Sequence, residues 1–74
     1  MKTFVVCPEG RAWYEVKAAN AEAAYRCECS WFSPRHKIAI VDVDTGITSM
    51  FTREIDRDGN LMNIVNHKLF TMAL

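Results

Sequence analysis

Two short turns, each containing an acidic residue and ending in glycine, constrain the fold of this chain more than any other feature of its sequence. They span Cys7–Gly10 and Val43–Gly46, and each follows a run of apolar residues. Pro8 presets the backbone of the first turn, and the terminal glycine of each can adopt the left-handed conformation that a tight hairpin requires. The sequence therefore predicts two β-hairpins.

The residues that flank these turns have the composition of strands. Lys2 to Cys7 is rich in β-branched and aromatic residues and contains no strand breaker. Arg11 to Ala18 alternates between two faces, and the face expected to point to the core carries Ala12, Tyr14, Val16 and Ala18. Ile38 to Val43 is apolar at nearly every position, which indicates a central strand covered on both faces. Ile47 to Ile55 carries several hydroxyl side chains and should be half exposed.

An alanine-rich segment between the two hairpins predicts a helix from Ala21 to about Phe32. Asn20 is a good N-cap, and the proline at position 34 ends the helical pattern. Two apolar stripes run along this helix. The first, expected to face the sheet, carries Ala23, Ala24, Cys27 and Trp31.

The second stripe of the helix is the candidate interaction surface. This stripe consists of Ala21, Tyr25, Cys29 and Phe32, and the last three are the candidate contact residues. It either packs under the C-terminal segment or binds a protein partner, because an exposed apolar patch of this kind marks an interface.

The segment after Asn60 has two interpretations. Helical spacing of its apolar residues, among them Leu61, Ile64 and Leu69, favours a C-terminal helix. The turn signal Asp58-Gly59 favours a further hairpin instead. The expected fold is one α+β domain over residues 1–74, a compact hairpin, helix, hairpin arrangement. It has a four-stranded, mainly antiparallel sheet, one helix packed on it, and a C-terminal helix or a further β segment.

Composition limits the function classes. The 74 residues include nine basic and nine acidic side chains, so no strong net field attracts nucleic acid or anionic lipid. No apolar run approaches the roughly 20 residues of a membrane span. Three cysteines, an odd number, suit the reducing cytoplasm. So small a chain builds a limited core, which favours stabilisation as a homodimer.

The motifs that resemble catalytic or metal sites are better explained as structure. Asp44-Thr45-Gly46 is the tripeptide of aspartic proteases, but the glycine-rich flap of that family is missing, so we interpret it as a turn. Asp42 to Asp44 and Asp56 to Asn60 lack the spacing of a calcium loop. We therefore expect no enzyme activity through Asp44 and no calcium site.

A zinc site is the other metal hypothesis. Its candidate ligands are Cys7, Cys27, Cys29, His36 and His67. Two cysteines two positions apart on a helix point in nearly opposite directions and cannot grip one ion. We therefore expect no metal and no cofactor.

The stretch Glu15–Arg26 is similar to the strand-to-helix junction of many short accessory proteins of bacteria, phages and mobile elements. The hairpin, helix, hairpin order also resembles that of β-grasp domains, which implies a parallel pairing of the first and last strands. The leading functional hypothesis is a non-enzymatic protein-interaction or regulatory module of such a source. The alternative is a nucleic-acid-binding accessory protein in which Arg35 and Lys37 contact phosphate and Trp31 stacks on a base.

Overall fold

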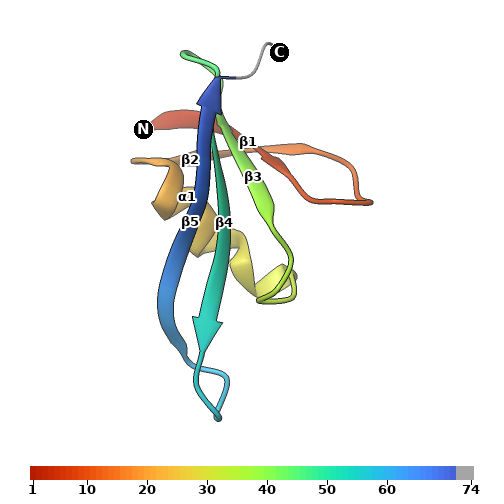
Figure 1. Cartoon of the computed structure of the whole chain (residues 1–74). Helices are drawn as coiled ribbons and strands as arrows, with labels where there is room; N and C mark the ends of the chain where they lie inside the picture. Colours follow the sequence, from red (N-terminus) through yellow and green to blue (C-terminus); the bar gives the residue numbers. More distant parts are fainter. Residues whose placement is uncertain (72–74) are drawn as a thin grey trace.

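The computed structural model describes the backbone of residues 1–71 and the side chains of residues 1–67 and 69. Its elements in chain order are β1 (Lys2–Cys7), β2 (Tyr14–Ala18), α1 (Ala21–Glu28), the short 3₁₀ helix η1 (Cys29–Trp31), β3 (Ile38–Asp42), β4 (Ile47–Ile55) and β5 (Leu61–Thr71). The strands form one antiparallel sheet in the order β2-β1-β3-β4-β5, and α1 covers one of its faces (Figure 1). No helix in this part of the chain is long and apolar enough to cross a bilayer.

The two turns expected from the sequence join β1 to β2 and β3 to β4. Gly10 and Gly46 take the left-handed conformation, with φ of 73° and 74°. The Gly46 N–H donates to the Asp42 carbonyl at 2.7 Å and closes the second turn. Both hairpins are therefore confirmed, and β3, buried at every position, is the central strand of the five, as its apolar run indicated.

The helix begins as predicted and ends earlier. The Asn20 side-chain oxygen accepts from the Ala23 N–H at 2.8 Å, which is the expected N-cap. The α-helical segment stops at Glu28, and the chain tightens into η1 before Phe32 becomes extended.

The C-terminal helix is wrong, because the segment after Asn60 forms the edge strand β5. The Asp56 side chain accepts from the N–H groups of Asp58 and Asn60, both at 2.9 Å, and Gly59 has a φ of 84°. This turn brings Leu61 back antiparallel to β4, where β-branched residues are favoured. The sheet therefore has five strands rather than four.

The parallel pairing implied by the β-grasp resemblance is also wrong. β1 lies between β2 and β3 and is antiparallel to both. The β1–β3 pairing, which aligns Phe4 with Asp42, is the only one among the described strands that joins elements separated by the helix.

The helix presents the second apolar stripe to the sheet, and from the first stripe only the two alanines pack against the core. Tyr25 is fully buried and stacks on Phe51, with ring centroids 5.2 Å apart and planes at 26°. Cys27 is exposed, and Trp31 is 69% exposed. Hydrophobic stabilisation grows with the apolar area removed from water, and the second stripe carries two aromatic rings where the first carries one, so the second stripe decides the orientation. The main core comprises Phe4, Val6, Ala18, Ala24, Tyr25, Cys29, Phe32, Ile38, Ile40 and Phe51.

Arg53 fastens β4 to the end of the helix. Its Nη1 donates to the carbonyl of Cys29 at 2.5 Å and to that of Phe32 at 2.8 Å. Its backbone N–H donates to the Pro34 carbonyl at 3.3 Å. A cation at the carbonyl end of a helix satisfies acceptors that the helix leaves unpaired.

Candidate functional site

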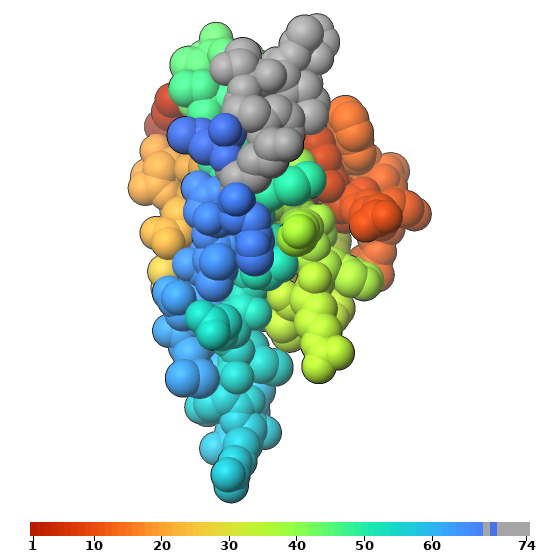
Figure 2. Space-filling model, viewed as in Figure 1, coloured from red at the N-terminus to blue at the C-terminus, as the bar shows by residue number. Residues whose placement is uncertain are grey.

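The outer part of the β4–β5 hairpin leaves the body of the protein as a two-stranded arm. β3 pairs with β4 only from Thr48 to Phe51, whereas β5 follows β4 to its end. We call residues Thr52–Val65 the β4–β5 arm; it projects beyond the other strands in Figures 1 and 2. Arg53 and Ile64 anchor its base, since Ile64 packs against the main core.

The arm exposes apolar side chains beyond this anchored base. Ile55, Leu61 and Met62 are 41%, 40% and 68% exposed. Across the arm, the Asn63 side-chain amide donates to the Glu54 carboxylate at 3.2 Å. An isolated two-stranded ribbon is at best marginally stable in water, so burial of its apolar side chains against another surface stabilises it.

The two edges of the sheet differ in how they are protected. β2 has five residues, and it exposes Glu15 and Lys17. Short length and charge are the usual means of blocking unwanted strand pairing. β5 has eleven residues, and from Leu61 to Val65 it carries no charged side chain. Two register shifts against β4 bracket a regular stretch that includes Asn63–Val65.

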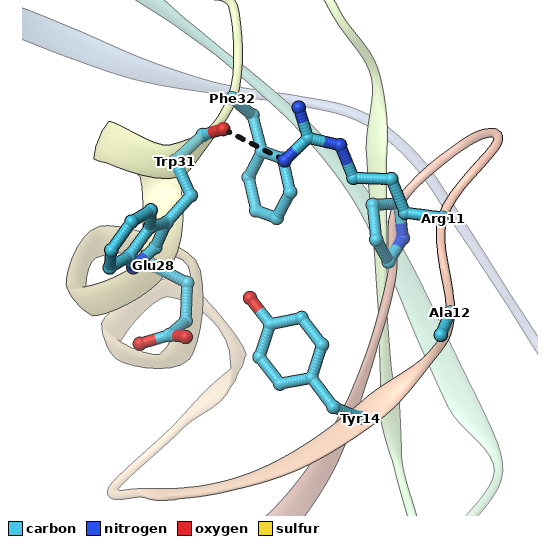
Figure 3. Close-up of a pocket in the computed structure, with 7 residues that line it drawn as sticks. Arg11, Ala12, Tyr14, Glu28, Trp31 and Phe32 are labelled. Carbon is cyan, nitrogen blue, oxygen red and sulfur yellow. Dashed lines mark hydrogen bonds between the residues drawn. The ribbon is translucent and has the colours of Figure 1, made fainter.

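A second candidate site is a hollow between the β1–β2 loop and the end of the helix (Figure 3). We call it the aromatic hollow; its volume is about 320 Å³, and it is lined by Pro8, Arg11, Ala12, Tyr14, Glu28, Trp31 and Phe32. Arg11 crosses its upper side in this view, and its Nη1 donates to the Trp31 carbonyl at 3.3 Å. The Arg11 guanidinium carbon lies 5.6 Å from the centre of the Phe32 ring.

Tyr14 and Glu28 supply the polar part of the aromatic hollow. Burial raises the pKa of Tyr14 to about 12, and interaction of its hydroxyl with the Glu28 carboxylate adds to the shift. The Tyr14 phenol is therefore neutral at physiological pH. Both side chains are half-buried, so they are accessible from the hollow.

The same loop borders another hollow on the opposite side, with a volume of about 660 Å³. Its lining includes Cys7, Trp13, Lys37 and Met50. Burial raises the pKa of the Cys7 thiol, so this sulfur stays protonated and is a poor nucleophile.

The residues predicted as an interface lie in the core. Tyr25, Cys29 and Phe32 are 0%, 8% and 7% exposed, because the sheet itself covers their stripe. A partner of the folded chain cannot reach them, so the predicted interaction surface is not on this stripe.

The residues predicted to contact nucleic acid are all exposed: Arg35, Lys37 and Trp31. Trp31 lines the aromatic hollow, whereas Lys37 lines the hollow on the other side of the loop. Arg35 lies in the connector, where its N–H donates to the Ser33 hydroxyl at 3.4 Å. Neither hollow brings all three together.

The motifs assigned to turns occupy turns. Asp44 is exposed, and its N–H donates to the Asp42 side chain at 2.9 Å. Asp42 also pairs with Lys2 at 2.5 Å. Cys7 and Cys29 belong to separate clusters on opposite faces of the sheet, and among the described residues no three His, Cys, Asp or Glu side chains are grouped to hold a metal ion.

Sequence reasoning missed the arm and most of the aromatic hollow. The turn signal Asp58-Gly59 indicates the arm, but the apolar residues that follow it also fit helical spacing. No motif or spacing in the sequence links Arg11 and Glu28 to Trp31, because the three residues meet only in the folded chain. The chain matches no protein-family model, no curated protein and no solved structure.

Proposed function

We propose that this chain is a non-enzymatic protein-interaction module that acts through the β4–β5 arm, and that the partner is a second copy of the same chain. The observation that carries the proposal is the arm itself, which leaves Ile55, Leu61 and Met62 exposed beyond the supporting strand β3. Protruding ribbons with apolar side chains are stabilised when a partner adds a strand or covers them. The three free cysteines support action in the cytoplasm.

A second copy fits this edge for reasons of symmetry and charge. A twofold axis perpendicular to an edge strand sets that strand against an antiparallel copy of itself. The stretch Leu61–Val65 carries no charged residue, so pairing it with its own copy creates no like-charge contact. The other outer strand, β2, places Glu15 and Lys17 at the surface and disfavours such pairing.

The test compares two isoleucines of the same strand. Ile55 lies in the arm and Ile47 at the opposite end of β4, and their exposures are 41% and 44%. We expect the wild-type chain to be a dimer at micromolar concentration by sedimentation equilibrium. Ile55→Lys should weaken the dimer about tenfold or more, a change of about 1.4 kcal/mol. Ile47→Lys should leave the dissociation constant within about twofold.

Two results would overturn the proposal. The first is a wild-type chain that remains monomeric at all concentrations up to the solubility limit. The second is a dimer that Ile47→Lys weakens as much as Ile55→Lys does. Circular dichroism of both variants checks that any change in mass reflects association and not unfolding.

Nucleic-acid binding through Arg35, Lys37 and Trp31 stays a prediction. It requires salt-sensitive binding to DNA or RNA that Arg35→Ala and Lys37→Ala both weaken. A gel shift at low salt tests it, and no complex at that salt would exclude it.

A further inference from the structure

The aromatic hollow combines several groups that attract positive charge. The rings of Tyr14 and Trp31 stand on two of its sides, and Phe32 lies between them at its upper side in Figure 3. The Glu28 carboxylate lies on the same side as Trp31. The hollow also adjoins η1, the carbonyl end of the helix, which carries partial negative charge. The face of an aromatic ring attracts a cation because of its quadrupole.

Arg11 shows how a cation can use this environment. Its guanidinium already lies over the Phe32 ring and bonds to the Trp31 carbonyl. Arg11 belongs to an exposed loop, and in Figure 3 its guanidinium lies beside Phe32, on the other side of the hollow from Glu28. The chain therefore supplies one cation itself, and the carboxylate of Glu28 is the charge available to a second.

The geometry points to the aromatic hollow as a binding site for an alkylammonium cation. In this site the rings of Tyr14 and Trp31 enclose the cationic head and the Glu28 carboxylate is its counter-ion. Proteins recognise quaternary ammonium groups with aromatic rings, and a nearby carboxylate adds Coulomb attraction for the cation. The volume of about 320 Å³ is at the small end of ligand pockets and suits a trimethylammonium head with a short chain.

This site is independent of the proposed dimer. None of its lining residues belongs to the β4–β5 arm. The raised pKa of Tyr14 keeps that phenol uncharged, so the hollow presents a single carboxylate and two neutral rings to its ligand. Arg11 opposes the binding of a second cation by charge repulsion, and this makes the effect of removing it diagnostic.

The probe is choline, and the reporter is the fluorescence of Trp31. The chain has two tryptophans, so Trp13→Phe leaves Trp31 as the sole indole. Choline chloride is titrated with sodium chloride adjusted to constant ionic strength. The matched neutral ligand is 3,3-dimethylbutan-1-ol, which has the shape of choline without its charge. We expect saturable binding of choline in the millimolar range, at least about fivefold tighter than binding of the alcohol.

Three variants in the Trp13→Phe background identify the groups involved. Glu28→Gln should weaken choline binding about fivefold to tenfold, because it removes the counter-ion. Glu22→Gln removes a carboxylate from the exposed first turn of the same helix and should change binding less than about twofold. Arg11→Ala should tighten binding, because it removes a competing positive charge and uncovers the Phe32 ring.

Each alternative outcome has a defined meaning. Equal affinity for choline and the neutral alcohol, or equal effects of Glu28→Gln and Glu22→Gln, would show a merely apolar hollow and overturn the proposal. Weaker binding in Arg11→Ala would overturn it as well, since it would show that Arg11 helps to build the hollow and does not compete with the ligand for it. No fluorescence change up to 100 mM choline, confirmed by unchanged amide NMR shifts of Trp31 and Glu28, would also exclude the site. A trimethyllysine peptide that binds more tightly than choline would support the site and identify a modified protein as the source of the cation.

Discussion

The buried hydroxyl of Tyr25 gives the sharpest test of the core. The side chain is fully buried, and its oxygen has no hydrogen-bond partner of normal geometry among the described residues. Burial raises the pKa of this phenol, although the Arg53 guanidinium lies close enough to lower that pKa as a donor would. Its ring stacks on Phe51. Tyr25→Phe removes the hydroxyl and keeps the ring, so it isolates the effect of one unpaired polar atom.

The magnitude follows from two opposing terms. A buried polar group without a partner costs about 1–3 kcal/mol of stability. The void left by one oxygen forfeits a few dispersion contacts, each worth about 0.1–0.2 kcal/mol. We therefore expect Tyr25→Phe to raise the free energy of unfolding by about 1 kcal/mol. For a domain of this size that corresponds to a melting temperature about 4–8 °C higher.

The assay is urea unfolding followed by far-UV circular dichroism. Both chains carry Ile55→Lys, which we expect to weaken the dimer, and both are measured at the same low concentration so that association does not contribute to the difference. Tyr14→Phe is the comparison for a hydroxyl that has a partner, because the half-buried Tyr14 interacts through its hydroxyl with the Glu28 carboxylate. It should lower the free energy of unfolding, by up to about 1 kcal/mol, where Tyr25→Phe raises it. A loss of about 1 kcal/mol or more in Tyr25→Phe, with the slope of the transition unchanged, would show that the hydroxyl has a native partner and refute the reasoning.

Three further predictions concern other parts of the molecule. Arg53→Met should lower the free energy of unfolding by about 2–3 kcal/mol, because two carbonyls lose a charged donor; urea unfolding measures this, and Arg57→Met in the exposed arm turn should have no comparable effect. The pKa of Asp42 is lowered, chiefly by the hydrogen bond from Lys2. The contribution of this pair to the free energy of unfolding is therefore present above the unfolded carboxyl pKa of about 3.9 and is lost as the pH falls through the lower folded pKa. Asp42→Asn should remove that part of the acid dependence in unfolding curves between pH 5 and pH 2, and an unchanged acid limb would contradict it. Cys27 is the one exposed thiol of three and should be alkylated first in the native chain, as peptide mass spectrometry can show, whereas equal labelling of all three would contradict the buried positions of the others.

Local features of the fold could be predicted from single residues. Glycine at the turns and Asn20 at the start of the helix determine the local backbone geometry by themselves, without the help of tertiary contacts. The segment Leu61–Thr71 could not be assigned this way, because its apolar residues fit both a helix and a strand. Only pairing with β4 decides between them.

The candidate site was harder to predict than the fold. The helix pattern shows two apolar stripes but not which one the sheet covers, so it cannot place Tyr25 in the core, where the structure has it. The aromatic hollow joins Arg11 in one loop with Glu28 and Trp31 at the end of the helix. No spacing rule links residues that meet only after the sheet and helix have packed.

The pairing of β1 with β3 has a consequence for how the chain folds. The other neighbouring strands of the sheet are also neighbours in the chain, so their contacts form without a long search. The β1–β3 pairing instead closes a loop from Phe4 to Asp42 that contains the whole helix. We expect this closure to limit the folding rate. Shortening a side chain where β1 pairs with β3, as in Val6→Ala, should therefore slow folding, while shortening a side chain of the arm should mainly speed unfolding. The chain therefore folds as two local units, β1–β2 and β3–β4–β5, and the slow step joins them where β1 pairs with β3.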